Sequence, residues 1–251
     1  MKTSKIIIYI VVSGVLMSFI LMFISAKYIN NEQPKQFNCN IIKLPDFSTV
    51  VFDQQANYYL KADDSNFLEI KYWGKKKNFS NQFEVKNDTL FLHYQFEKSV
   101  NSIHLGCKNV NKIIIKNNAI VTISKLNPDT LSILVNHSFL FIKHHTIEVN
   151  DTSQNKTLTR IELMNRSTFR TNDSEFQELI LNSDKSLADF LNVKLNKTTI
   201  RISSGSTLYT RLLHCTGKYS FKSDNTSKYF VNTNKKLKPV EKLSFYFLFL
   251  L

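Results

Sequence analysis

The chain repeats one pattern of residues in IIIKNNAIV (113–121), ILVNHSFLF (133–141), IELMNRSTF (161–169), LILNSDKSL (179–187) and IRISSGSTL (200–208). Each segment begins with two apolar residues at alternate positions, continues with small or polar residues, and ends on an apolar residue. Alternate residues of a strand point to the same side. Aligning the segments at every second residue therefore predicts that their last residues all point inward after a polar bend: Val121, Phe141, Phe169, Leu187 and Leu208.

The spacing of these segments favours a β-solenoid. Their first residues lie 20, 28, 18 and 21 positions apart. A solenoid coil of about that length has a short strand on each side and stacks about 4.8 Å from the next coil. Asparagine suits the bends, because it tolerates left-handed backbone and its amide can bond to the next coil. A β-sandwich, whose strands recur about every 8 to 12 residues, is the alternative. Residues 174–191 give the best helical pattern after the N-terminus but also fit strands, so we expect an all-β domain.

The N-terminus carries a candidate membrane anchor. Residues 6–26 form a run of 21 uncharged residues between Lys5 and Lys27. As a helix this run is about 32 Å long, enough to cross a bilayer core of about 30 Å. A cleaved signal peptide is the alternative, although its apolar region usually spans about 7 to 15 residues and the bulky Ile24 makes a poor cleavage site. The lysines before the run favour a cytoplasmic N-terminus, so we expect a single-pass membrane protein whose main domain lies outside the cytoplasm, in the periplasm or at the cell surface.

The rest of the chain divides by composition. We expect a cytoplasmic tail and transmembrane anchor (1–27), a stalk (28–45), a β-solenoid domain (46–232), and a basic linker with an apolar C-terminal tail (233–251). The last nine residues are apolar apart from one Ser. They are too few to span a membrane, so we expect them to cap the final coil, with contact to the membrane surface as the alternative.

Composition and charge restrict the possible partners. Apolar residues make up 43% of the 251 residues, and only 5 Gly and 4 Pro are present, which excludes wholesale disorder and collagen-like structure. The formal net charge of +13 favours anionic surroundings. Besides the membrane itself, the candidate partners are acidic glycans and anionic lipid headgroups. Nucleic acid is not expected, because the domain is predicted to be exported.

Three ordered motifs after the stalk resemble a known family. FSTVVF (47–52), ADDSNFL (62–68) and NDTLFL (87–92) are similar in order and spacing to the opening strand, the following Asn-containing segment and the hairpin of the auto-transporter adhesin, head GIN domain family (DUF2807-like) of bacterial envelope proteins. The five repeats follow, so the resemblance covers about residues 40–225. It implies a β-solenoid-like extracytoplasmic domain with an adhesive or binding role and no established catalytic residues.

The bends depart from that family in their glycines. The family's Gly-Ser-Gly appears as Ser204-Gly205-Ser206 in one repeat, and the other repeats have Asn117-Asn118-Ala119, Asn136-His137-Ser138, Asn165-Arg166-Ser167 and Asp184-Lys185-Ser186. Asn and Asp replace Gly at positive φ with a modest penalty. We therefore expect the bends to survive these replacements.

No residue is assigned a catalytic, cofactor-binding or metal-binding role, and no cofactor is expected. The six histidines lack the H-x-x-x-H or H-x-H spacing of metal ligands, residues 203–206 do not form a G-x-S-x-G nucleophile elbow, and glycine-rich phosphate-binding motifs are absent. A glycan-active β-helix enzyme is the alternative. The repeats, however, align basic residues without acidic partners, which favours binding over cleavage; the aligned positions are Lys116, His137, Arg166, Lys185 and Gly205.

Two further features leave alternatives open. Nine Asn-x-Ser/Thr sequons are typical of a glycosylated type II surface protein of a eukaryote or virus, which is a third functional hypothesis. Cys39, Cys107 and Cys215 allow one long-range disulfide or, equally, free thiols.

Overall fold

The computed structural model describes residues 2–30, 37–75, 78–92, 99–126, 128–143, 157–232 and 238–239. Its helical elements are α1 (Lys2–Asn30) and the 3₁₀ turn η1 (Ser80–Gln82). The strands of the first half are β1 (Phe37–Lys43), β2 (Thr49–Phe52), β3 (Asn57–Ala62), β4 (Phe67–Trp73), β5 (Glu84–Lys86), β6 (Thr89–Leu92), β7 (Val100–Cys107), β8 (Lys112–Ile115) and β9 (Ile120–Ser124). Those of the second half are β10 (Thr130–Asn136), β11 (Phe139–Lys143), β12 (Leu158–Met164), β13 (Thr168–Asp184), β14 (Leu187–Ser203), β15 (Thr207–Cys215), β16 (Tyr219–Ser223), β17 (Lys228–Asn232) and β18 (Lys238–Pro239). The all-β prediction is confirmed, and residues 174–191 lie in strands rather than a helix.

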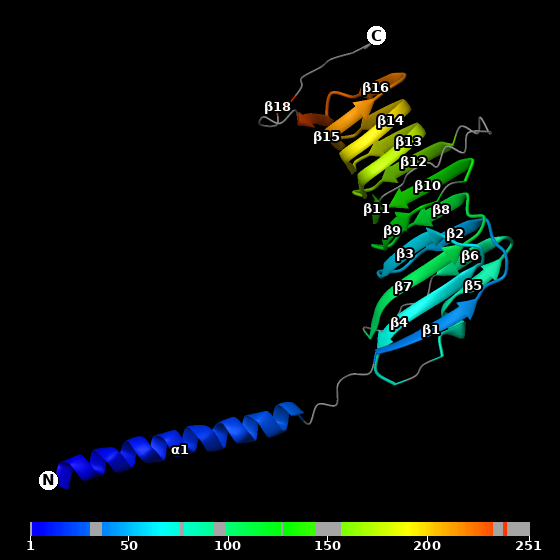
Figure 1. The fold of residues 1–251 in the computed structure, drawn as a ribbon. Coiled ribbons are helices and arrows are strands. Elements are labelled where there is room, and N and C mark those ends of the chain that lie inside the picture. The colour runs from blue at the N-terminus through cyan, green and yellow to red at the C-terminus, as the bar shows by residue number, and fades with distance from the viewer. Residues whose placement is uncertain are drawn as a thin grey trace.

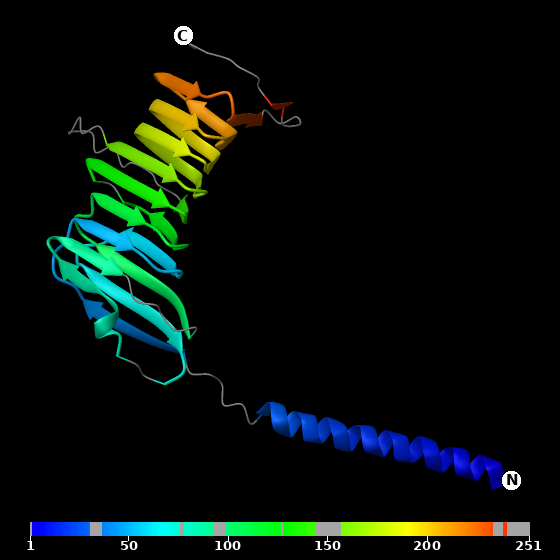
Figure 2. The same ribbon diagram turned by 180° about the vertical axis from the view of Figure 1, so that it is seen from behind.

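From β8 onward the chain winds into stacked parallel coils (Figures 1 and 2). We use "coil" for one turn of chain whose strands pair in parallel register with the preceding and following turns. One inward position of each coil pairs with the equivalent position of the next, in the order Ile113, Ile133, Ile161, Leu181, Ile200 and Phe221. These residues are 20, 28, 20, 19 and 21 positions apart, so the interval of about 20 residues predicted from the sequence recurs in the register of the strands.

Two of the five sequence segments were aligned out of register. In the second segment Leu140 and Ile142 are buried, and Phe141 points outward. In the fourth segment Ala188 is buried and Leu187 is only half-buried. The predictions of an inward Phe141 and an inward Leu187 are therefore wrong. The reason is the length of the bend, because changing it by one residue moves every following side chain to the other face of the strand.

The bends use left-handed backbone, as predicted, but not always at the predicted residue. Asn117, Asn118 and Asn165 have φ of 57°, 63° and 53°. In two other bends the residue with positive φ is basic, namely His137 (φ 51°) and Lys185 (φ 47°), and not the neighbouring Asn or Asp. The second bend thus has one left-handed residue where the first has two, which explains the shift in register.

A ladder of small side chains lines the inside of these bends. The residue after each left-handed position is Ala119, Ser138, Ser167, Ser186 or Ser206, and all five are buried. The Oγ of Ser186 accepts a hydrogen bond from the backbone N–H of Ser167 at 3.1 Å, and the Oγ of Ser206 accepts one from the N–H of Ser186 at 3.2 Å. On the outside, Asn165 Nδ2 donates a hydrogen bond to Asn136 Oδ1 at 2.8 Å. This is the hydrogen bond between asparagine amides of successive coils that the sequence predicted.

The first half of the domain is built differently. Strand β4 pairs antiparallel with both β1 and β7, and β5 and β6 form a hairpin. This hairpin, which the resemblance of residues 87–92 implied, turns at Asn87 and Asp88, with φ of 49° and 59°. Strands β2 and β3 lie between the β6–β7 layer and the β8–β9 layer, pairing in parallel with both. The interval of about 20 residues therefore does not extend to this part.

One hydrophobic core runs through both halves. Buried apolar side chains from Phe47 to Leu208 form a single cluster. At the far end Tyr219, Phe221 and Tyr229 are only partly buried against it. The predicted capping tail, 243–251, lies outside the described residues.

Side chains of α1 are described for residues 11–25 only. They are exposed, and Met22 and Phe23 have 70% and 74% of their surface accessible. Among the residues that the structure describes, no helix satisfies the combined length and hydropathy needed to cross a membrane.

Candidate binding face

The outward side chains of one side of the stack form two parallel columns. We call this side the aromatic–basic face; it comprises β7, β3, β9, β11, the first parts of β13 and β14, and then β15 and β17. In-register pairing places its central column in the order His104, Tyr59, Thr122, Phe141, Arg170, Asp189, Tyr209 and Phe230. The column beside it contains Lys61, Ser124, Lys143, Asn172, Leu191 and Arg211. Neighbours within a column lie one strand spacing apart, about 4.8 Å.

Aromatic rings recur along the central column. Tyr59 stacks on His104 with ring centroids 4.7 Å apart and planes inclined by 16°. Tyr209 stacks on Phe230 at 5.0 Å and 12°. Burial, together with the charge of nearby Lys71, lowers the pKa of His104 below its usual range, so its ring is neutral at pH 7. The column therefore carries a stacked pair of rings at each of its ends.

A carboxylate between two arginines occupies the middle of the face. Asp189 is 8% exposed. Arg211 donates from Nε to Asp189 Oδ1 at 3.2 Å and from Nη2 to Oδ2 at 2.5 Å. The Nε of Arg170 lies 3.8 Å from Oδ2 of the same carboxylate. The arginine side chains keep 57% (Arg170) and 40% (Arg211) of their surface accessible, so Asp189 orients two guanidinium groups that still face solvent.

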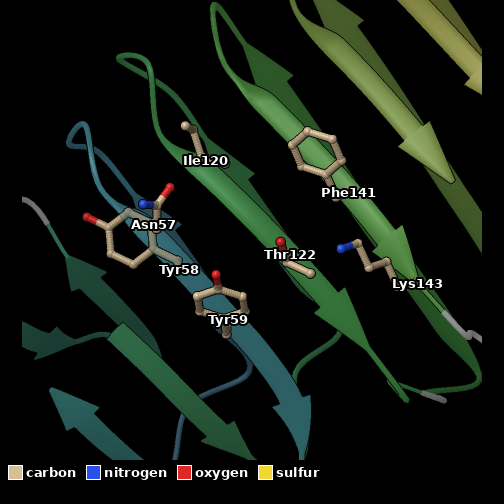
Figure 3. Close-up of a pocket in the computed structure, with 7 residues that line it drawn as sticks. All are labelled: Asn57, Tyr58, Tyr59, Ile120, Thr122, Phe141 and Lys143. Carbon is tan, nitrogen blue, oxygen red and sulfur yellow. The ribbon is translucent and has the colours of Figure 1, made fainter. Parts of the chain in front are cut away.

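Two adjoining hollows lie on this face. The first, of about 150 Å³, is lined by residues of β3, β9 and β11. Figure 3 shows Tyr59, Thr122 and Phe141 on three neighbouring strands, and Lys143 further along the strand that carries Phe141. The second, of about 400 Å³, is lined by Phe141, Lys143, Arg170, Asp189, Leu191 and Arg211, among others. Phe141 and Lys143 line both hollows, which makes them one extended depression along the stack.

The basic residues that the sequence aligned lie elsewhere. His137, Arg166 and Lys185 are at the bends, where the N–H of Arg166 donates to the carbonyl of Lys185 at 2.8 Å. Lys116 lies just after β8 and forms an ion pair with Asp53 at 2.7 Å. These residues therefore make an edge of the stack and not its strand face. The aromatic–basic face was not predicted, because its members come from different coils and become neighbours only through the strand register.

Other sequence features have structural roles. Asp63 and Asp64 lie in a bend beside β3, and Asp63 forms an ion pair with Lys61 at 3.3 Å. Asn66, in the motif that resembles the adhesin family, is buried; its Nδ2 donates to Asp46 Oδ1 and its Oδ1 accepts from the N–H of Lys108, both at 2.9 Å. In the described part of the chain, no three His, Cys, Asp or Glu side chains are close enough together to hold a metal ion.

All three cysteines have free thiols. Cys107 is buried, and Cys39 and Cys215 are exposed. Burial raises the pKa of Cys107 to about 12.

Comparisons with known proteins show similarity of fold. No family model matches the chain, and no curated protein matches it. A solved structure titled "putative adhesin" from Parabacteroides distasonis has a TM-score of 0.50 and 11% identity, covering 78% of this chain and 94% of that one. A "putative adhesin" from Parabacteroides merdae has a TM-score of 0.44 and 11% identity, covering 78% and 92%. Another, from Bacteroides fragilis, has a TM-score of 0.44 and 14% identity, covering 76% and 98%.

At these identities the likeness extends to the fold alone. The likeness to the Parabacteroides distasonis structure thus concerns an all-β fold, while membership of the head GIN domain family stays a prediction.

Proposed function

We propose that this protein is a membrane-anchored, extracytoplasmic, non-catalytic binding or adhesion module of the bacterial cell envelope. The aromatic–basic face is the observation that carries this proposal. It combines partly exposed rings, oriented guanidinium groups and a shallow depression along the coils. Such a surface suits a long anionic ligand, and acidic glycans and anionic lipid headgroups are the candidates.

The number and bonding of the carboxylates on this face favour binding over cleavage. Glycoside hydrolysis uses two carboxylates placed on either side of the scissile bond, about 5 to 10 Å apart. Asp189 lines the larger hollow, and both of its oxygens accept hydrogen bonds from Arg211. Asp189 is the one carboxylate among the described residues that line this hollow, so the second carboxylate that hydrolysis needs is not supplied there. The chemistry of Asp189 here is to position arginines.

The anchor is proposed from the sequence and supported by the exposed side chains of α1. The 21 uncharged residues 6–26 suffice for a bilayer core. An apolar helix surface of this extent is unfavourable in water. Within the helix, Ser18 Oγ donates to the carbonyl of Val15 at 2.7 Å, and Ser25 Oγ to that of Met22 at 3.0 Å. Hydroxyls satisfied by their own helix are what a lipid environment requires.

We also infer that the domain is a β-solenoid and not a β-sandwich, with boundaries near residues 46 and 232. Parallel pairs between strands about 20 residues apart support this, because sandwich strands are antiparallel. The likeness of fold to the Parabacteroides distasonis structure supports assigning the chain to an adhesin-like fold family. The head GIN domain family remains the specific candidate.

The binding proposal is tested with the full-length chain in detergent micelles. Calorimetric titration with polygalacturonate, dextran and phosphatidylglycerol vesicles compares an acidic glycan, a neutral glycan and an anionic lipid. We expect binding to at least one anionic ligand that weakens as salt is raised, and no release of reducing ends. Equal binding to dextran, or turnover of any polysaccharide, would overturn the proposal.

The anchor has its own test. Intact mass of the chain extracted from the membrane should correspond to residues 1–251. A mature chain beginning near Lys27 would show instead that residues 6–26 are a cleaved signal.

A further inference from the structure

We propose that the larger hollow of the aromatic–basic face is a site for one carboxylated sugar unit. In this assignment Arg170, Arg211 and Lys143 bind the carboxylate, and Phe141 packs against the sugar ring. Asp189 is a positioning residue. The inference rests on the proposed binding function and names the ligand class for that face.

The charge balance of the hollow calls for an anion. Three cationic side chains line it, those of Lys143, Arg170 and Arg211, against the single carboxylate of Asp189. Within the described residues, the ion pairs of this hollow are the two between Asp189 and the arginines. Counted over the described residues that line the hollow, two positive charges therefore remain uncompensated in a concave surface, where they attract an anion more strongly than on a flat one.

The guanidinium groups have donors to spare and are held in place. A guanidinium has five N–H donors, and Arg211 uses its Nε and Nη2 on Asp189. The remaining donors of Arg211 and those of the more exposed Arg170 belong to side chains that line the hollow and are partly accessible to solvent. Because the shared carboxylate fixes both arginines, less side-chain entropy is lost when a ligand binds.

The ligand needs an apolar face next to its charge. Phe141 is half-buried and lies directly beside Arg170 in the strand register, and both line the hollow. A pyranose ring has an apolar C–H face that packs on an aromatic ring, and a uronic acid carries its carboxylate on that ring. A free small anion would use the arginines but leave Phe141 without a role.

The arginine fork by itself does not distinguish a carboxylate from a phosphate, because it matches both. A uronic acid polymer carries a carboxylate on every ring and can therefore place rings and charges all along the face, whereas a sugar phosphate carries nearly two charges on one group. A sugar phosphate is therefore compared with the acid in the test.

The rest of the face lets a polymer extend along the stack. From Tyr59 to Phe230 the central column spans six strand steps, or roughly 29 Å. This length accommodates several consecutive sugar units, with stacked ring pairs at both ends. An oligomer is therefore expected to bind more tightly than a monosaccharide.

The test measures how the full-length chain binds three probes by calorimetric titration. These are hexagalacturonate, its methyl ester, which keeps the ring but loses the charge, and glucose 6-phosphate. We expect hexagalacturonate to bind at least about tenfold more tightly than the ester, because a hydrogen bond to a charged group contributes about 1.5–3 kcal/mol. Equal affinity for the acid and the ester, or tighter binding of the phosphate, would overturn the carboxylate site.

Variants locate the site. Arg211→Ala should weaken hexagalacturonate binding at least about tenfold. Phe141→Ala should weaken the acid and the ester by a similar factor of about three to ten. Asp189→Asn removes the carboxylate that orients both arginines, so it should lower the preference for hexagalacturonate over its methyl ester, whereas a merely structural role would weaken both ligands alike.

The matched control is Arg201→Ala, on the opposite side of the stack in β14, where its side chain is exposed and pairs in register with Asn182 and Lys222. Its affinity for hexagalacturonate should equal that of the wild type, and circular dichroism should show all variants folded.

The outcomes separate the site from the function. If Arg201→Ala and Arg211→Ala lose affinity equally, the assignment of the site is wrong although the binding function stands. If only phosphatidylglycerol vesicles bind, the face recognises lipid and the sugar site is overturned. If none of the anionic ligands binds, the proposed function fails as well.

Discussion

The two halves of the domain stack strands in different ways. In residues 112–232 each coil pairs with the next coil in sequence, at intervals of 19 to 28 residues. In residues 37–107 the pairs are antiparallel or out of sequence order, and β2 pairs with β8 across 63 residues. The first half thus closes one end of the stack with strands that do not repeat, while the second half grows by repetition. Apolar side chains from both halves share one core, so the halves should unfold together.

The largest expected effect tests that shared core. Leu163→Asp places a charge at a position that is 1% exposed, in the middle of the repeating half. An unpaired buried charge costs at least several kcal/mol, comparable to the total stability of a typical domain, about 5–15 kcal/mol. We expect the whole domain to unfold, as measured by far-UV circular dichroism at 25 °C.

The matched control for Leu163→Asp is its neighbour. Met164→Asp changes the next residue of the same strand, which is 41% exposed, and should leave the domain folded. If hydrogen exchange shows β1–β7 still protected in Leu163→Asp, the two halves are independent and the shared core does not couple them.

The next effect concerns a close contact in the non-repeating half. A Cβ at Gly106 would lie 2.2–2.7 Å from ring atoms of Phe67, the residue paired with it across β4 and β7. Gly106→Ala should therefore destabilise the domain by about 1–3 kcal/mol, measured by urea unfolding. In a Phe67→Leu background the same substitution should cost far less, because the contact is gone. An equal cost in both backgrounds would show that the ring does not determine the effect.

The difference between the halves explains what the sequence could reveal. The coils were visible because Ile113, Ile133, Ile161 and Ile200 occupy the same inward position, and each coil meets its neighbour in sequence. The arrangement of β1–β7 has no periodic pattern in the sequence. The turn between β5 and β6 has a local one, the residue pair Asn87-Asp88. The register of the second and fourth segments was wrong because a bend with one left-handed residue, His137, aligns differently from one with two, Asn117 and Asn118.

The candidate face was harder to predict than the fold. Its members, such as Tyr59, Phe141 and Arg170, come from different strands, and each is unremarkable in its own strand. Only the register brings Phe141 beside Arg170 and Arg170 beside Asp189. The excess of basic residues predicts an anionic partner class, which stays a prediction, and the basic residues aligned by the repeats, including Arg166 and Lys185, lie at the bends. Charge is thus readable from composition, whereas the geometry of a site is not.

A smaller effect on stability is expected from the serine ladder, which occurs only in the bends of the repeating half among the described residues. Ser186→Ala removes the acceptor of the buried Ser167 N–H. An unsatisfied buried donor costs about 1–3 kcal/mol, so the free energy of unfolding in urea should fall by that amount. Ser203→Ala, which removes an exposed hydroxyl bonded to Asp184, is the control and should change stability by about 0.5 kcal/mol or less. Equal effects would show that the ladder contributes nothing specific.

The smallest effect belongs to the non-repeating half and depends on pH. Burial raises the pKa of Cys107 from 9.0 to about 12. Above pH 9 the unfolded chain loses this proton while the folded chain keeps it, so the contribution of the thiol to stability is present below pH 9 and is lost as the pH rises toward 12. Between pH 8 and pH 9.5 the free energy of unfolding should fall by about 1 kcal/mol more in the wild type than in Cys107→Ala. The variant is the reference because the exposed Cys39 and Cys215 and other groups titrate alike in both chains. Urea unfolding at the two pH values measures the difference, and parallel pH dependences would show that Cys107 ionises as easily in the folded state as in the unfolded one.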